Sequence, residues 1–433
     1  MKNCPSLQNQ VIYTVFLRAH TEEGSFRALI PDLDRIRALG VDIVCLMPIY
    51  LAAPEYGAET MPYPYSVLDH RQFSLEYGSI DDFRELLCEI HQRGMKCVLD
   101  VVMDSLCRAS ELYREHPEFF RSDEEESPES ANEAEMLYLD YGNRDVRAYQ
   151  METLVMWAKL VDGFRCVSAP MVPLDFWQQA RREINAQKPD FIWIAETVDF
   201  ASRGFLNRWR GRDYASDADL LRVFDAVSDD AIYPAFRDYL EGRGTLSRYV
   251  DLLNLQEAGY PSGYRMMRYF ENREEPRLHS FVWERKKLAN YMAFLYFLTG
   301  PVQLYEKQEY GKHGGPNLTL RELYFPYPIE DLSDIVRRLG EIRRQYFSAD
   351  DTFYAEADDE RRVVLAERSD GRTLKVGVFS LDAAPVDMRL ILPDGDFVNL
   401  FNGETVSLRD CRLRCNGSPI LFTYELPSGD GAK

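Results

Sequence analysis

One strand-like segment of this chain carries a single charged residue. The run GFRCVSA, at residues 163–169, contains Arg165 among uncharged neighbours. Val167 stands two positions later, where an arginine that faces a barrel interior usually has a carboxylate to hold. A guanidinium buried without a partner is costly. The segment therefore predicts a carboxylate from another element beside Arg165, and it leaves open whether this strand has lost a catalytic group or never had one.

Carboxyl groups stand inside or directly after other apolar runs of the same kind. Asp100 lies in KCVLDVVMD, Glu196 lies in FIWIAET, and Glu274 follows YRMMRYFEN. Carboxylates are the usual acids, bases and nucleophiles of enzymes, and α/β barrels carry their chemistry at the carboxyl ends of their strands. These three residues are therefore the candidates for chemistry in this chain.

The elements that must position these residues form a regular alternation. Apolar strand-like runs alternate with amphipathic helical runs from residue 11 to about residue 346, which is the pattern of βα units around a parallel sheet. Several runs are apolar on both faces, as strands between a barrel interior and a ring of helices are. The predicted strands are VIYTVFL (11–17), VDIVCLMP (41–48), KCVLDVVMD (96–104), GFRCVSA (163–169), FIWIAET (191–197), LLRVFDA (220–226), YRMMRYFEN (264–272) and PVQLYEKQE (301–309).

The sequence changes in character after about residue 350. Short strand-like runs such as LKVGVFSL and ILFTYEL are separated by Asp-Gly, Asn-Gly and Pro, which is typical of a small antiparallel β domain. We therefore predict a (β/α)8 TIM barrel at 1–347 and a C-terminal antiparallel β-sandwich at 352–433. The polar, acidic and aperiodic segment 121–136 predicts a mobile loop.

Composition and charge exclude several classes of ligand. The 433 residues carry a formal net charge of −20, which argues against nucleic acid and against anionic membranes, whereas a neutral ligand such as a sugar is compatible. The N-terminal residues lack the apolar core of a signal peptide, and no apolar run is long enough to span a membrane. Eight scattered cysteines show no disulfide framework and no zinc spacing. We expect a cytoplasmic protein with reduced thiols and no cofactor.

Eight βα units with carboxylates at strand ends, followed by an antiparallel β domain, resemble the α-amylase superfamily of glycoside hydrolases (family 13). The third strand of that family ends in D-x-V-x-N-H, and DVVMDS keeps Asp100 with Asp104 and Ser105 in the last two places. The fourth strand of the family reads G-F-R-x-D, so Val167 stands where the nucleophilic aspartate belongs. Glu196 matches the general acid/base glutamate of the fifth strand.

The resemblance extends to the seventh strand and to an upstream loop. The family's N-H-D motif is represented by Asn272, Arg273 and Glu274, which places Glu274 at the position of the transition-state-stabilising aspartate. The stretch PYPYSVLDH matches the loop whose tyrosine stacks on the sugar, here Tyr65. The resemblance thus implies substrate contacts for Tyr65, Asp100, Arg165, Arg273 and Ser105.

The altered residues predict a degenerate active site. Retaining hydrolysis needs two carboxyl groups about 5–5.5 Å apart, one of which forms a covalent bond to the anomeric carbon, and a valine cannot form that bond. Ser105 and Arg273 replace both of the family's sugar-binding histidines. We therefore expect Glu196 to be a vestigial acid/base that pairs with a nearby arginine, Asp100 to be a structural hydrogen-bonding group, and Arg165 to pair with Glu274.

The most consistent interpretation is an α-amylase-family protein directed at α-glucosides that is catalytically impaired. One alternative is an active glycosidase or transglycosidase in which Glu196 is the acid and Glu274 or Asp104 activates water, with inversion if the carboxyls lie about 6.5–9.5 Å apart. The other is an interaction scaffold that ignores sugars. An open cleft with an exposed Tyr65 favours sugar binding, whereas a mouth filled by Arg273 favours a scaffold.

We expect no metal, because the chain lacks a long domain after the third strand that could complete a calcium site around Asp104. A protein partner or a homo-oligomer is left open.

Overall fold

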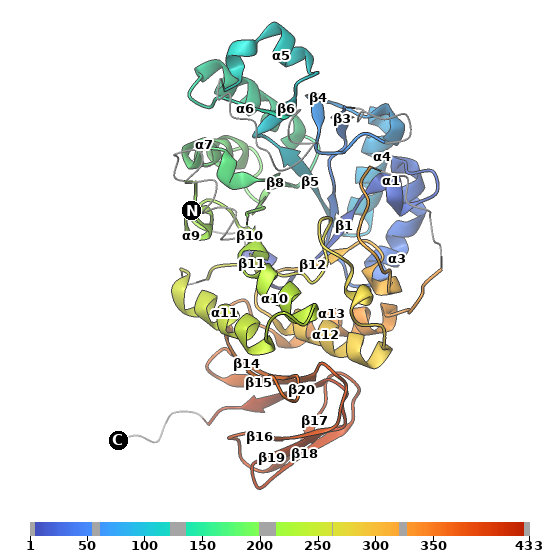
Figure 1. Ribbon diagram of the computed structural model, residues 1–433, viewed down its shortest axis with the longest axis vertical. Coiled ribbons are helices and arrows are strands. Elements are labelled where there is room, and N and C mark those ends of the chain that lie inside the picture. Colours follow the sequence, from blue (N-terminus) through green and yellow to red (C-terminus); the bar gives the residue numbers. More distant parts are fainter. Residues whose placement is uncertain are drawn as a thin grey trace.

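The computed structural model places a barrel above a smaller β domain (Figure 1). The structure describes residues 5–53, 61–121, 136–198, 214–261, 263–319 and 327–427. The predicted acidic loop at 121–136 lies almost wholly outside these residues.

The larger part is a closed parallel barrel. Its eight strands are hydrogen-bonded in the order β11-β10-β9-β8-β5-β2-β1-β12, and a parallel bridge between Arg268 and Val302 joins the two ends of this order. The fold predicted from the sequence is thereby confirmed. The strands are β1 (Val11–Val15), β2 (Ile43–Leu46), β5 (Lys96–Val102), β8 (Gly163–Val167), β9 (Ile192–Ala195), β10 (Ala226–Ser228), β11 (Met266–Met267) and β12 (Val302–Tyr305).

Most apolar side chains inside the barrel are small or β-branched, and many of the larger ones pack between the strands and the helices. The inner cluster consists of Leu7, Ile12, Ile43, Cys45, Val98, Ile192, Ile194, Ala226 and Met267. Residues two positions apart on one strand, such as Ile192 and Ile194, point to the same side.

Helices surround the barrel and begin where the sequence provides caps. Ser79 accepts the N–H of Asp82 while the Asp82 side chain accepts the N–H of Ser79, which is a full capping box at the start of α4. The helices are α1 (Leu17–His20), α2 (Phe26–Leu29), α3 (Leu33–Ala38), α4 (Ile80–Gln92), α5 (Glu111–Glu115), α6 (Arg144–Ala158), α7 (Leu174–Asn185), α9 (Asp217–Leu220), α10 (Tyr233–Leu240), α11 (Leu246–Gly259), α12 (Arg285–Phe297) and α13 (Ser333–Tyr346).

The prediction for the sixth strand was wrong by several residues. The segment 220–226 was expected to be a strand, but β10 begins only at Ala226. Ser216 and Asp219 form a capping box that starts the short helix α9, so the residues just before 220 are helical. The apolar run at 220–224 leads from that helix into the strand. The strand ends at Ser228, so the acidic residues that follow it lie at the barrel mouth.

Two short antiparallel pairs lie between the barrel strands and their helices. The first pair is β3 (Tyr50–Ala52) with β4 (Val67–Phe73), and the second is β6 (Ser105–Cys107) with β7 (Met136–Tyr138). Both pairs extend beyond the barrel strands on the same side, where Figure 1 shows them above β5 and β8.

The C-terminal part is a sandwich of two four-stranded antiparallel sheets, as predicted. Val376, Leu408, Leu413 and Phe422 are among the buried side chains of its core. The first sheet contains β13 (Thr352–Asp358), β14 (Val363–Ser369), β15 (Thr373–Ser380) and β20 (Ile420–Glu425), and the second contains β16 (Val386–Arg389), β17 (Gly395–Val398), β18 (Thr405–Arg409) and β19 (Arg412–Cys415).

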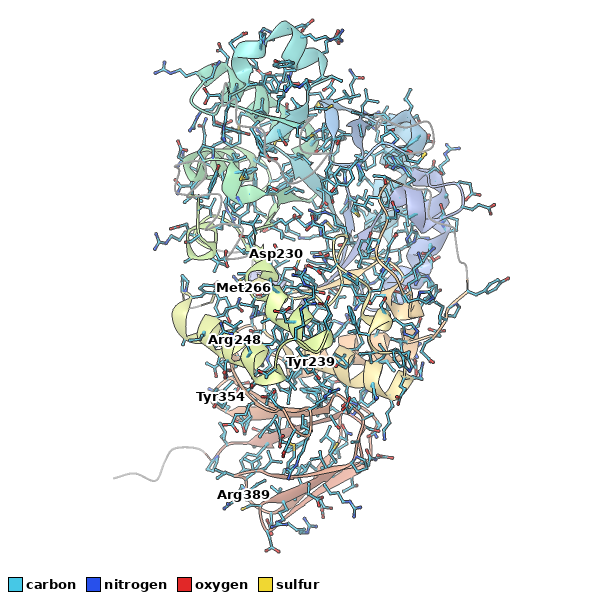
Figure 2. The ribbon with its side chains drawn as sticks, in the orientation of Figure 1. Asp230, Tyr239, Arg248, Met266, Tyr354 and Arg389 are labelled. Carbon is cyan, nitrogen blue, oxygen red and sulfur yellow. The ribbon has the colours of Figure 1, made fainter. Side chains whose placement is uncertain are left out.

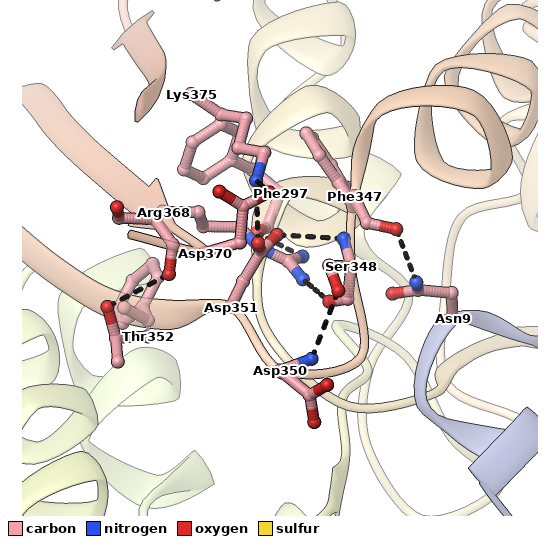
Figure 3. Close-up of polar contacts among 12 residues, drawn as sticks. Asn9, Phe297, Phe347, Ser348, Asp350, Asp351, Thr352, Arg368, Asp370 and Lys375 are labelled. Carbon is pink, nitrogen blue, oxygen red and sulfur yellow. Dashed lines mark hydrogen bonds and ion pairs between the residues drawn. The ribbon is translucent and has the colours of Figure 1, made fainter. Parts of the chain in front are cut away.

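A buried charge network joins the sandwich to the barrel (Figure 3). Asp351 accepts hydrogen bonds from Arg368 Nε (3.1 Å) and Lys375 Nζ (2.7 Å). Arg368 also donates to the carbonyl oxygen of Phe297 (3.2 Å) at the end of α12, and its guanidinium lies 4.4 Å from the ring of Phe347. One arginine of the β domain is therefore held by the linker and by the barrel together.

Candidate active site

The residues predicted to do chemistry gather at the carboxyl ends of the barrel strands. Asp100 and Arg165 lie inside the barrel on adjacent strands, while Glu196 and Arg273 follow β9 and β11. Asp230 lies two residues after the end of β10, in the short turn Asp229–Ala231, and Figure 2 labels it in the barrel, above the C-terminal part. This end of the barrel is where the fold places its chemistry.

The predicted pair between Arg165 and Glu274 is wrong. Arg165 Nε and Nη2 donate to the two oxygens of Asp100 at 2.7 and 2.5 Å, and Nη1 donates to Gln303 at 2.7 Å. Asp100 and Arg165 are register partners on β5 and β8, so both side chains enter the barrel at the same level. The Glu274 side chain, in contrast, is 59% exposed.

Asp100 is the structural hydrogen-bonding group that the sequence predicted. It is fully buried, and besides Arg165 it accepts hydrogen bonds from Tyr65 Oη (3.1 Å) and Cys45 Sγ (3.4 Å). Burial lowers the pKa of Arg165, but the charge and hydrogen bonds of Asp100, together with the nearby Cys45 and Tyr65, raise it by more, so the net shift is upward and the guanidinium remains charged. Both oxygens of Asp100 are thus committed to the protein.

Val167 ends β8 and belongs to the hydrophobic core. Its register partner on β5 is Val102, which is in the same core cluster, and Val167 is 5% exposed. Ser168 follows with φ 48° and ψ 40°, a left-handed conformation that ends the strand. The position that the resemblance assigns to a nucleophile is therefore aliphatic and closed.

Glu196 pairs with a nearby arginine, as predicted. Arg273 Nη1 and Nη2 donate to its two oxygens at 2.7 and 2.5 Å, and Arg273 Nη2 also lies 3.0 Å from Glu274. Burial raises the pKa of Glu196, but the charge and hydrogen bonds of Arg273, with the charge of Arg165, lower it below the ordinary value. Glu196 is therefore ionised at neutral pH.

Tyr65 is covered. The guanidinium of Arg273 lies 4.4 Å from the centre of the Tyr65 ring, and Tyr65 is 7% exposed. Ser105, the other predicted sugar contact, lies in β6 opposite Tyr138 of β7 and is 4% exposed. Neither Tyr65 nor Ser105 lines the cleft that the barrel mouth retains.

A cleft of about 460 Å³ lies beside this closed centre, over the ends of β8 to β12. Arg165, Glu196, Arg273 and Glu274, predicted from the sequence, are among its lining residues. Asp230, Tyr233, Arg237, Tyr269 and Glu275 also line it and were not predicted. Asp230 could have been found as one of two aspartates that follow the sixth strand. It was missed because the sixth strand was predicted several residues too early.

The carboxyl group of Asp230 has a raised pKa. Its carboxylate accepts hydrogen bonds from the hydroxyls of Ser228 and Tyr269 and from the N–H of Thr197 (3.1 Å). Burial, followed by the charges of Glu196 and Glu274, raises its pKa to about 7, against the lowering effect of the hydroxyl hydrogen bonds. Asp230 and Glu196 thus have pKa values shifted in opposite directions.

Local backbone geometry sets the outer wall of the cleft. Asn272 Oδ1 accepts the N–H groups of both Glu274 and Glu275 at 2.8 Å, which is an Asx turn. The turn leaves Glu274 largely exposed and directs Glu275 to Arg237 (3.1 Å).

Neither a metal-binding cluster nor a membrane-spanning helix occurs among the described residues. In that part of the chain, no group of three or more His, Cys, Asp or Glu side chains is arranged to hold a metal ion. No described helix is long and apolar enough to cross a membrane.

Comparison with known proteins agrees with the fold. The protein-family model "Alpha amylase, catalytic domain" matches residues 10–130, and the family model "Bacterial Alpha amylase C-terminal domain" matches residues 354–422. The α-amylase MalA of Haloarcula japonica is 26% identical over 92% of this chain, which covers 59% of that protein. An intracellular maltogenic amylase of Bacillus subtilis is 23% identical over 74% of this chain, which covers 55% of it. The chain therefore spans a little over half the length of these curated relatives.

Solved structures give fuller coverage. A noncanonic maltogenic α-amylase of Thermotoga neapolitana is 28% identical with a TM-score of 0.83, and the alignment covers 97% of this chain and 99% of that one. An α-amylase of Lactobacillus plantarum is 32% identical with a TM-score of 0.89, and the alignment covers 96% of this chain and 99% of that one. On this similarity along almost the entire sequence, the chain belongs to the α-amylase family of glycoside hydrolases.

Proposed function

We propose that this protein recognises α-glucosidic carbohydrate at its barrel mouth and does not hydrolyse it by the retaining mechanism. The observation that carries the proposal is the state of the two catalytic positions. Val167 occupies the nucleophile position, and Arg273 holds both oxygens of Glu196.

The nucleophile position offers no substitute for the missing carboxylate. The register partner of Val167 is another valine, and the carboxylate on the adjacent strand, Asp100, is bound on both oxygens by Arg165. A covalent glycosyl intermediate needs a group with a free lone pair at this place. Loss of a nucleophile costs on the order of 10⁴-fold or more in rate in comparable enzymes.

Glu196 cannot serve as the acid while Arg273 holds it. A general acid must carry a proton at the working pH, and catalytic carboxylic acids reach this state through a raised pKa. The pKa of Glu196 is lowered instead, since Arg273 and Arg165 stabilise its charge. Its carboxylate contributes an ion pair rather than a proton.

Binding remains possible because the cleft beside the closed centre is large and polar. A cleft of about 460 Å³ lined by carboxylates and arginines suits a small carbohydrate, since such sites place a few polar groups around the ligand. Family membership supports α-glucosides as the ligand class.

The test measures turnover and binding on the same preparation. We expect no release of reducing sugar from α-1,4- or α-1,6-linked glucosides over hours at high protein concentration, and we expect calorimetry to detect maltooligosaccharide binding. Glu196→Gln is the control, because contaminating activity survives this substitution. Turnover that Glu196→Gln abolishes would show that the protein is a working hydrolase.

The second candidate function is an interaction scaffold that binds no sugar. The covering of Tyr65 by Arg273 favours it, because that contact closes the surface on which a sugar ring would stack. Absence of binding in the same calorimetric experiment selects it. A rearranged hydrolase has less support: Glu274 is exposed, and Asp104 is not a lining residue of the cleft.

A further inference from the structure

The charged side chains of the cleft pair with one another except at one place. Three arginines of the cleft have carboxylate partners, and Arg273 is shared by Glu196 and Glu274. The pairs are Arg165–Asp100 (2.5 Å), Arg273–Glu196 (2.5 Å) and Arg237–Glu275 (3.1 Å). Asp230 has no arginine, lysine or histidine within ion-pair distance among the residues that the structure describes.

The partners of Asp230 are all neutral donors. The Ser228 and Tyr269 hydroxyls and the Thr197 N–H satisfy its oxygens without cancelling its charge. The charged groups that act on it most, Glu196 and Glu274, are negative. An ionised Asp230 therefore makes this side of the cleft electrostatically complementary to a cation.

Two tyrosines and an asparagine lie in the same cleft as this carboxylate. The rings of Tyr233 and Tyr269 stack on each other, with centroids 5.0 Å apart and planes 20° apart, and both side chains are buried in the wall of the cleft. Asn272 also lines the cleft, and because its Oδ1 is taken up by the Asx turn, its amide group is the part that can donate to a ligand hydroxyl.

We propose that the cleft takes a carbohydrate that carries a protonated amine, with the ammonium group against Asp230. This inference rests on the proposed function, because it names the ligand class of the same cleft. A neutral sugar satisfies the hydrogen-bonding groups but leaves the charge of Asp230 uncompensated, whereas an amino sugar satisfies both.

The test compares two ligands that differ only in the charged group. Methyl 6-amino-6-deoxy-α-glucoside and methyl α-glucoside are titrated calorimetrically into the full chain at pH 8, where the amine is protonated and Asp230 is mostly ionised. We expect the amino sugar to bind about fivefold more tightly, which is the upper end for one solvent-accessible ion pair. The preference should fall between about 0.05 M and 0.5 M salt, because salt screens the attraction.

Asp230→Asn should reduce the preference to near one, and its fold is checked by circular dichroism. Glu152→Gln is the matched control: it also removes one negative charge, from an exposed position on α6, and it should keep the preference. Equal affinity of the parent protein for both ligands, or a preference that persists in Asp230→Asn, overturns this inference alone. Absence of binding by both glucosides and by maltooligosaccharides overturns the proposed function as well.

Discussion

At the scale of single residues, Val167 lies in an aliphatic contact rather than in a pocket prepared for a carboxylate. Arg165, the group that would neutralise an aspartate at this position, already makes two hydrogen bonds to Asp100 and one to Gln303. Among the described residues, Val167 is therefore surrounded by groups that offer no free cation to a carboxylate at this position.

Val167→Asp should remain inactive and should be less stable than the parent. The new carboxylate would compete with Asp100 for Arg165 and would replace a core side chain, which costs about 1–3 kcal/mol for a buried polar group without a full partner. Thermal melting measures the loss, and an activated aryl glucoside measures activity. A glycosyl adduct on the introduced aspartate in mass spectrometry would show that this position alone silences the site.

The raised pKa of Asp230 has a consequence for stability. The folded protein holds a proton on this carboxyl up to about pH 7, whereas the unfolded chain releases it near pH 4. Between these values the folded state binds more protons, so Asp230 makes stability fall as the pH rises.

Asp230→Asn should remove that dependence. We expect the Tm of Asp230→Asn relative to the parent to increase between pH 5 and pH 8, because only the parent has to ionise a buried carboxyl over this range. The groups that set the shift, Glu196, Glu274, Tyr269 and Ser228, are unchanged in the variant. A Tm difference that is constant over this range would mean that Asp230 is already ionised at pH 5.

At the scale of elements, the sequence predicts all eight barrel strands because each one is an apolar run between amphipathic helices. The sixth strand was predicted too early because the Ser216–Asp219 capping box starts a helix directly before it. An apolar run alone does not distinguish the end of a helix from the start of a strand. With the strand predicted to end at Ala226, the aspartates that follow were not expected at the barrel mouth, and Asp230 was missed.

The partner of Arg165 could not be found from the sequence. Whether Asp100 or Glu274 reaches the guanidinium depends on the register between β5 and β8, and parallel strands joined by a long crossover do not reveal their register locally. The pairing of Glu196 with an arginine was predictable, because an ionisable group at a barrel mouth needs a partner. The covering of Tyr65 depends on the side-chain position of Arg273 and is visible only in the structure.

At the scale of the whole molecule, the barrel and the sandwich share buried surface as well as the charge network of Figure 3. Phe379 of β15 lies against Phe294 and Phe297 of α12, with ring centroids 5.5 Å apart in both pairs. Burial lowers the pKa of Arg368 to about 10 in spite of Asp351, which indicates how strongly this charge depends on its partner. The division of the chain between residues 347 and 352 remains a prediction about independent domains.

Asp351→Asn should weaken the junction between the barrel and the sandwich more than the loss of any exposed ion pair would. It leaves Arg368 without a carboxylate and Lys375 with only the partly exposed Asp370, and removing one partner of a buried pair costs about 3–5 kcal/mol. All five tryptophans precede residue 347, so tryptophan fluorescence reports the barrel while circular dichroism reports both parts. In urea, the two signals should share one midpoint in the parent and separate in Asp351→Asn, since the sandwich loses its attachment first. Asp370→Asn, which removes only the outer contact of Lys375, should shift the midpoint little. Coincident transitions with an unchanged midpoint in Asp351→Asn would show that aromatic packing alone holds the two parts together.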